Sequence, residues 1–209
     1  ETMDQDTPVP SNGLAMKIAP ASLFFPRKRE MLQTIERLAS LTHRHSASLA
    51  AAVAVATGIQ YIVSKCAGYK AGESPLDAHP LEHPPEHPLD AQEFIACVAD
   101  AASLYDAYFG KVIRSGKIVN DLSCSVYTTV PNAIWTFASR PTEFRKGMIE
   151  LVNSGGDTDT KAAMYGALSG AFNGFSRLPA AWVEGLEDGK KGKDHLLEVA
   201  EALYAKRRV

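Results

Sequence analysis

The chain has 209 residues, of which 45% are hydrophobic and 22% are charged, and its formal net charge is −2. This composition is ordinary for a soluble globular protein, and the lack of a long block of one charge argues against nucleic acid or a membrane as a partner. The three cysteines, Cys66, Cys97 and Cys124, are widely spaced and form no CxxC pair. They predict buried, reduced thiols. Because the acidic N-terminus is also unlike a signal peptide, we expect a cytoplasmic protein.

The first third of the chain predicts a loop followed by two helices. Residues 1–13 are polar and rich in proline and glycine, which is typical of a loop. Apolar residues recur at helical spacing over 27–40, and a second helix is predicted over 46–62 with Ser46 as its N-cap. Small residues dominate the second helix and Gln60 interrupts its apolar run. We therefore interpret it as a closely packed core helix and not as a membrane span.

A proline-rich break is predicted over residues 71–89, where five prolines accompany His79, His83 and His87. Histidines at four-residue spacing would suit metal capture on a helix, but the prolines are incompatible with one. An extended linker or surface loop is the favoured interpretation, and metal storage is the alternative.

The second half of the chain again shows helical spacing. Helices are predicted over about 90–112, 129–138, 141–152, 160–175, 178–186 and 194–205, with Pro141 at the first position of the third. No convincing alternation of strand type occurs. We therefore predict an all-α fold, a compact multi-helix domain with short connections that covers residues 1–209.

The strongest chemical signal is a Gly-Gly-Asp-Thr-Asp-Thr run directly before the helix that starts near residue 160. Gly155 and Gly156 allow a tight turn whose backbone can approach a ligand closely. Asp157 and Asp159 supply two carboxylates and Thr160 a hydroxyl, a set of hard oxygen donors that suits Mg²⁺ or Mn²⁺ better than zinc. The alternative is structural: Asp157 or the threonine after it caps the helix.

Four segments resemble the ADP-ribosylglycohydrolase family, in the family's order and over nearly the whole chain. They are Asn-Gly-Leu-Ala-Met-Lys-Ile-Ala-Pro at 12–20, Thr-His at 42–43, Val-Pro-Asn-Ala-Ile-Trp at 130–135, and the Gly-Gly-Asp-Thr-Asp-Thr loop at 155–160. A helix of small residues and a Leu-Pro-Ala-Ala-Trp step at 178–182 follow that loop, as they do in the family. The resemblance implies hydrolysis of the glycosidic bond between ADP-ribose and a modified protein side chain.

The resemblance also implies roles for individual residues. Asp157, Asp159 and Thr160 match the ligands of a pair of Mg²⁺ or Mn²⁺ ions, and the two aspartates are the candidate catalytic groups. The candidate ligand-binding residues, which would contact ADP-ribose or an ADP-ribosylated protein, are Ser11, Asn12, Gly13, His43, Gly155 and Gly156. For His43, a partly buried, hydrogen-bonded histidine between two helices is the structural alternative. Lys17 stands where the family more usually has arginine, so bidentate hydrogen bonding is lost there.

One family feature is missing from the sequence. The Thr-Asp-Asp-Thr loop that completes the family's metal site does not occur, and neither do the family's opening helices. Three explanations remain open: an N-terminal companion fragment that supplies the loop, a shortened gene product, or a relative without catalysis that binds ADP-ribose or has a structural role. Because the chain does not begin with Met, we expect the companion fragment and little activity of this chain alone.

Overall fold

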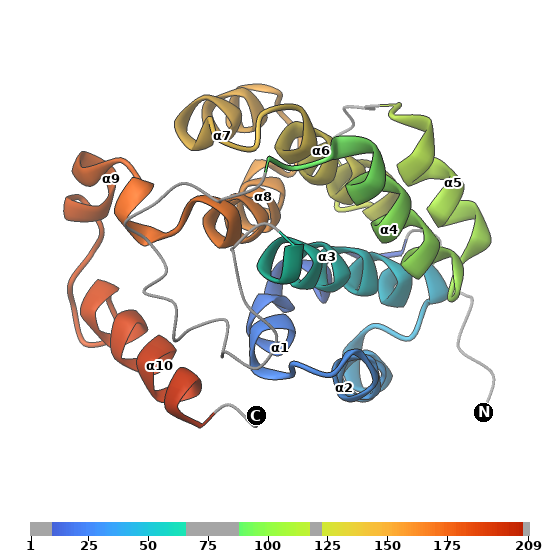
Figure 1. Cartoon of the computed structure of the whole chain (residues 1–209), viewed down its shortest axis with the longest axis horizontal. Coiled ribbons are helices and arrows are strands. Elements are labelled where there is room, and N and C mark those ends of the chain that lie inside the picture. Colours follow the sequence, from blue (N-terminus) through green and yellow to red (C-terminus); the bar gives the residue numbers. More distant parts are fainter. Residues whose placement is uncertain (1–9, 66–87, 118–122, 207–209) are drawn as a thin grey trace.

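The computed structural model describes residues 10–65, 88–117 and 123–206. Most of the predicted first loop, Cys66 and nearly all of the predicted break at 71–89 lie outside these residues. The described elements are η1 (Ala15–Lys17), α1 (Ala19–Phe24), α2 (Lys28–Thr42), α3 (Ser46–Lys65), α4 (Ala91–Ser103), α5 (Ala107–Ser115), α6 (Val126–Ser139), α7 (Phe144–Asn153), α8 (Thr158–Asn173), η2 (Phe175–Arg177), α9 (Ala180–Glu184) and α10 (Lys193–Ala205) (Figure 1). The described residues contain no strand, and a single bridge joins Ser11 to Ser125. The predicted all-α fold is confirmed.

Helix α3 lies at the centre of the bundle, in contact with α1, α2, α4, α6 and α8 (Figure 1). It is the one described helix long and apolar enough to cross a membrane, but 83% of that apolar window is buried inside the protein. Its small residues let its neighbours approach: a Cβ on Gly58 would lie 3.0 Å from Leu168 Cδ2 and 3.3 Å from the Phe94 ring. The predicted core helix is therefore confirmed.

The predicted cap of α3 is off by one residue. Ser46 is the first helical residue, and His45 Nδ1 accepts a hydrogen bond from the amide of Ala47 (3.1 Å). The Ser46 hydroxyl instead donates to Asp106 Oδ2 (3.2 Å) at the start of α5. Local sequence does not distinguish this role of Ser46 from that of an N-cap. In the structure, Ser46 joins the start of α3 to the start of α5.

The single helix predicted over 90–112 is wrong, because the chain turns back on itself there and forms α4 and α5. Asp106 starts α5 as its N-cap and accepts a hydrogen bond from the amide of Phe109 (2.9 Å). The absence of a side chain at Gly110 permits close packing, because a Cβ there would lie 2.8 Å from the Ala99 carbonyl oxygen. Continuous apolar periodicity concealed this break, since both helices bury one face against each other.

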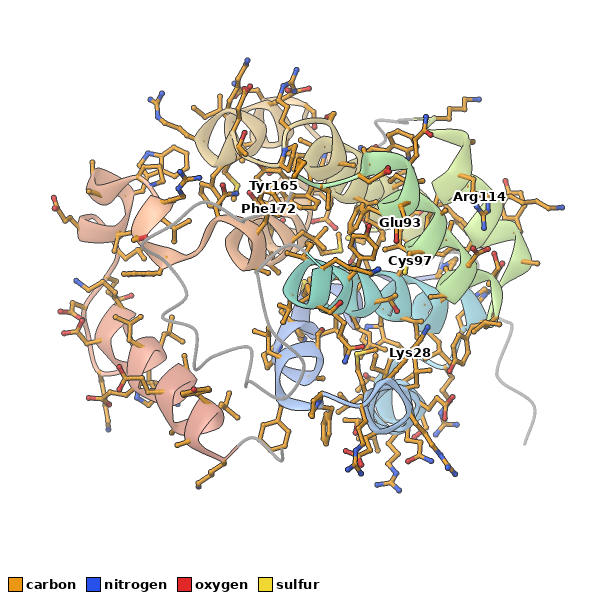
Figure 2. All side chains as sticks on the ribbon, in the orientation of Figure 1. Lys28, Glu93, Cys97, Arg114, Tyr165 and Phe172 are labelled. Carbon is orange, nitrogen blue, oxygen red and sulfur yellow. The ribbon has the colours of Figure 1, made fainter. Side chains whose placement is uncertain are left out.

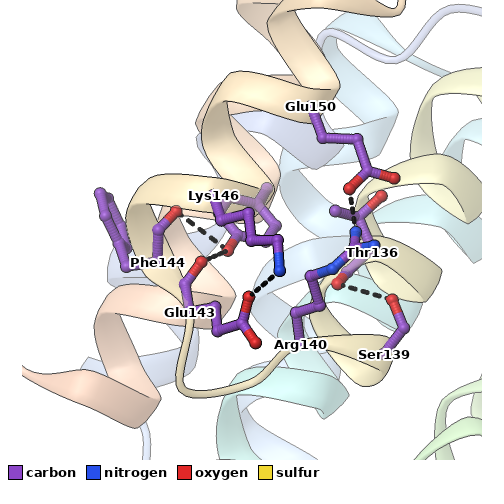
Figure 3. A network of polar contacts seen from close by, with 8 residues as sticks. Thr136, Ser139, Arg140, Glu143, Phe144, Lys146 and Glu150 are labelled. Atoms are coloured by element: carbon purple, nitrogen blue, oxygen red, sulfur yellow. Dashed lines mark hydrogen bonds and ion pairs between the residues drawn. The ribbon is translucent and has the colours of Figure 1, made fainter.

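Helix α7 also starts later than predicted. Pro141 lies in a turn closed by a hydrogen bond from the Glu143 amide to the Arg140 carbonyl (3.2 Å), and the helix begins at Phe144. Proline's fixed φ suits the second position of such a turn as well as the first position of a helix, so sequence alone did not separate them. Figure 3 shows the ion pairs around this turn, Glu143 with Lys146 (2.9 Å) and Arg140 with Glu150.

The last two helices lie at the edge of the bundle, where Trp182 of α9 makes an edge-to-face contact with Phe144 of α7. In the described part of the chain neither α9 nor α10 has a buried residue, and Figure 1 shows α10 beside α1. An apolar groove of about 260 Å³ separates them, lined by Ala19, Pro20, Leu23, Phe24, Ala200, Leu203 and Tyr204. The predicted helix at 194–205 is confirmed, whereas the helix predicted over 178–186 is the shorter α9.

Candidate functional site

The Gly-Gly-Asp loop leads directly into α8. Gly155 and Gly156 have φ values of 73° and 74°, a left-handed conformation that favours glycine. Asp157 occupies the N-cap position, yet its side chain accepts no hydrogen bond from a backbone amide in the first turn of α8. The capping interpretation of Asp157 is therefore wrong, and so is that of Thr158, which is already the first residue of the helix.

The Asp157 carboxylate is instead held by a residue far away in the sequence. Asn12 Nδ2 donates to Asp157 Oδ2 (2.7 Å) and also lies 3.1 Å from Thr129 Oγ1. Asn12 is buried, and its backbone amide donates to the Cys124 carbonyl (3.2 Å). One asparagine thus joins the loop before η1, the start of α6 and the loop before α8.

These contacts favour the ionised form of Asp157. Partial burial opposes ionisation, but hydrogen bonds from Asn12 and Thr160 outweigh it and lower the pKa of the carboxyl group. Cys124 also donates to this carboxylate, and that hydrogen bond raises the pKa of the thiol. The prediction of a buried Cys124 is wrong, because its side chain is exposed at the edge of the site; Cys97 is half-buried.

The three predicted metal ligands lie within four residues of one another. Asp159 is exposed in the first turn of α8, and the buried Thr160 hydroxyl oxygen lies 3.5 Å from Met16 Sδ. Their hard oxygens match Mg²⁺ in type, but the described residues include no group of three or more His, Cys, Asp or Glu side chains able to hold a metal. An octahedral ion would take its remaining ligands from water or from groups outside the described residues.

The predicted ligand loop at residues 11–13 packs against His43. A Cβ on Gly13 would lie 2.6 Å from His43 Nε2, so a larger residue would displace the imidazole. His43 is half-buried at the end of α2, its Nδ1 is 2.6 Å from Thr42 Oγ1, and burial followed by the charge of Lys17 lowers its pKa. His43 is therefore partly buried and hydrogen-bonded, as its structural alternative expects, and the imidazole borders the predicted loop. Ser11 is exposed, and its carbonyl accepts from Ser48 (2.8 Å).

Sequence reasoning missed several residues that touch these groups: Met16, Cys124, Thr129 and Lys161. The buried Lys161 donates from Nζ to the Gly155 carbonyl (2.6 Å) and to Ser154 Oγ (2.7 Å). A lysine between a threonine and two alanines at the start of a helix carries no local sign of burial. Only its place one turn after Asp157 hinted at a role in the loop.

The comparisons with known proteins agree with the fold and with the family that the sequence resembles. The model of the ADP-ribosylglycohydrolase family matches residues 2–209, and the chain belongs to this family. An uncharacterized protein of Archaeoglobus fulgidus is 28% identical over 204 residues, which cover 92% of this chain and 57% of that protein. ADP-ribosylhydrolase ARH3 is 27% identical in Xenopus tropicalis, with 94% of this chain and 61% of that protein covered.

Human ADP-ribosylhydrolase ARH3 is 26% identical, over 93% of this chain and 58% of that protein. Among solved structures, one described as an ADP-ribosylglycohydrolase-related protein complex has a TM-score of 0.72 at 24% identity, with 96% of this chain and 62% of that chain covered. That likeness shows the shared fold. The chain spans about three fifths of the length of these relatives.

Proposed function

We propose that this chain carries the ligand-holding part of a hydrolase that cleaves the glycosidic bond between ADP-ribose and a modified protein side chain. The observation that carries the proposal is the hydrogen bond between Asn12 and Asp157, at 2.7 Å. It joins the loop that the family resemblance assigns to the ligand to the loop that it assigns to the metal. Membership of the ADP-ribosylglycohydrolase family and the similarity to proteins named ADP-ribosylhydrolase support the reaction class.

The site favours Mg²⁺ or Mn²⁺ as the cofactor, held by Asp157, Asp159 and Thr160. A bound divalent cation would supply Lewis-acid stabilisation of charge that develops at the ribose. The protein's contribution is positional: Asn12 donates to Oδ2 of Asp157 and so fixes the direction of this carboxylate. We propose that the Asp159 carboxylate, which is exposed, accepts a proton from water.

The backbone of the loop at residues 11–13 is the proposed contact for the diphosphate and ribose. Gly13 is packed against His43, and the lowered pKa of His43 favours the neutral imidazole, which can both donate and accept a hydrogen bond. We propose a companion segment that supplies further donors in place of some water ligands, because Asp157, Asp159 and Thr160 fill only part of an octahedral ion's coordination sphere. The family's Thr-Asp-Asp-Thr loop has the matching chemistry.

The test measures ADP-ribose release from an ADP-ribosylated protein by the full chain, alone and with a fragment that contains the Thr-Asp-Asp-Thr loop. We expect release with the fragment and Mg²⁺, and its loss on addition of EDTA. Release that is indifferent to EDTA would refute the metal.

A second candidate function is binding without turnover, which the incomplete set of metal-binding side chains in the described residues favours. Calorimetry with ADP-ribose distinguishes the two functions. A binder retains affinity for ADP-ribose and shows no release with any fragment or Mg²⁺ concentration.

A further inference from the structure

Lys161 is a buried lysine in the first turn of α8 whose side chain reaches back to the loop before that helix. Its exposed fraction is 2%, although lysine is rarely fully buried in proteins. Nζ lies 2.6 Å from the Gly155 carbonyl oxygen and 2.7 Å from Ser154 Oγ. Both acceptors immediately precede the Gly156-Asp157 step, so the ammonium group is attached to the backbone that carries the candidate carboxylates.

The loop needs such a contact because its conformation is costly. Gly155 and Gly156 are consecutive left-handed residues, and glycine loses more conformational freedom on ordering than any other residue. No described atom lies within 4 Å of the position of a Cβ on Gly155, so side-chain packing does not hold the loop on that side. Hydrogen bonds from a charged donor are about twice as strong as neutral ones.

The contact also sets the direction of a peptide group. The carbonyl of Gly155 and the amide of Gly156 belong to one planar trans peptide, so they point in opposite directions. Because Lys161 holds the carbonyl, the Gly156 amide points away from the buried ammonium group. The next residue is Asp157, whose side chain is held independently by Asn12.

We propose that Lys161 is a positioning residue for the candidate site: its ammonium group fixes the Gly155–Gly156 turn, so that the carboxylates of Asp157 and Asp159 are in place before a ligand binds. The inference deepens the proposed function and rests on it where metal affinity is concerned. The order of the turn in the free protein does not depend on the proposed function. Order parameters of the metal-free protein therefore test the role of Lys161, and Mn²⁺ affinity also tests the proposed function.

The test is Lys161→Met, which keeps most of the side-chain length and removes the charge. In the metal-free full chain, we expect the ¹⁵N order parameters of Gly155 and Gly156 to fall from about 0.85 to below about 0.6. The Mn²⁺ concentration at half-saturation should rise about tenfold, the lower end for loss of a group that orients metal ligands. Tyr165→Phe is the matched control.

Tyr165 is buried in the same helix, one turn further along, and its hydroxyl donates to the Phe144 carbonyl (3.2 Å). Its loss should lower the melting temperature and leave both readouts unchanged. If Lys161→Met does not fold, Ser154→Ala removes one acceptor without leaving a buried ammonium group unpaired. For Ser154→Ala, we expect the order parameters to fall and the half-saturating Mn²⁺ concentration to rise, each by less than in Lys161→Met.

Unchanged order parameters in a folded Lys161→Met protein, or in Ser154→Ala if the first variant fails to fold, would overturn the positioning role. An equal fall in the Tyr165→Phe protein would overturn it too, since the loop would then respond to general destabilisation of α8. If the unmodified chain binds no Mn²⁺, the metal part of the proposed function fails, and the order parameters still decide the role of Lys161.

Discussion

Asp157 is restrained by two residues that lie on opposite sides of it in the sequence. Asn12 holds the carboxylate, and Lys161 holds the backbone of the loop that precedes it. The neighbouring Asp159 has a different environment, because it is exposed in the first turn of α8. At the scale of single residues, the site therefore contains one fixed carboxylate and one that is open to solvent.

We expect Asp159→Ala to abolish a Mg²⁺-induced rise in melting temperature with little loss of stability. An exposed carboxylate near a helix N-terminus contributes only about 0.3–1 kcal/mol to the free energy of unfolding. Asp194→Ala is the matched control, because Asp194 occupies the same second position of α10 and is also exposed. Thermal melts with and without Mg²⁺ check this. An undiminished Mg²⁺ effect in Asp159→Ala would exclude a ligand role.

At the scale of elements, N-caps and side-chain links decide where the helices begin and how they meet. The corner between α4 and α5 carries both kinds of contact. Asp106 caps α5 and accepts a hydrogen bond from Ser46 at the start of α3. Tyr105 donates from its hydroxyl to Glu36 on α2 (2.7 Å). The corner thus attaches the α4–α5 pair to both α2 and α3.

We expect Asp106→Ala to reduce the free energy of unfolding by about 1–2 kcal/mol, the upper part of the range for loss of an N-cap. Asp90→Ala is the control, because Asp90 caps α4 by accepting from the amides of Gln92 and Glu93. In the described part of the chain its carboxylate accepts only from its own helix and joins it to no other, so its loss should cost less. Urea denaturation measures both. Equal losses would mean that the Ser46 contact adds nothing.

The hydrogen bond between Tyr105 and Glu36 predicts a loss of stability at high pH. Burial, followed by the hydrogen bond to Glu36, raises the pKa of Tyr105 from 10 to about 12. A raised pKa means that the folded state holds the proton more tightly. The contribution to stability is therefore complete below pH 10 and is lost as the pH rises to about 12.

Tyr105→Phe should remove this contribution, about 0.5–1 kcal/mol because the pair is exposed. The difference in unfolding free energy between the two proteins should shrink between pH 10 and pH 12. Urea denaturation across this range measures it, and a constant difference would contradict the assigned pKa.

At the scale of the whole molecule, a chain of aromatic rings connects four helices. Tyr61 of α3, Phe94 of α4, Phe137 of α6 and Phe172 of α8 make successive edge-to-face contacts with centroids 5.3 to 5.8 Å apart. Figure 2 shows Phe172 and Tyr165 on α8 within the bundle. The apolar face of helix α10 borders the groove beside α1.

We expect Phe137→Ala to reduce the free energy of unfolding by about 3–5 kcal/mol, since Phe137 is fully buried and contacts rings on two other helices. Phe175→Ala, a substitution of an exposed phenylalanine just after α8, should cost less than about 1 kcal/mol. Urea denaturation with circular dichroism compares them. A small loss in Phe137→Ala would mean that the four helices do not form one cooperative core.

The sequence by itself determined the features that depend on near neighbours along the chain. Apolar spacing predicted the all-α fold, and the small residues of α3 predicted its close packing. The paired glycines predicted the turn before Asp157, because their left-handed backbone is a local property. The order of the four landmarks indicated the family, which the match over residues 2–209 confirms.

Only the tertiary structure decided which groups meet. The contact between Asn12 and Asp157 joins residues 145 positions apart, and no local pattern specifies such a pair. The turn at Asp106 was missed because apolar spacing continues through it, and the delayed start of α7 was missed because proline suits both a turn and the start of a helix. The exposure of Cys124 and the burial of Lys161 likewise depend on how α6 and α8 pack, since burial is a property of the whole fold and not of the chain around one residue.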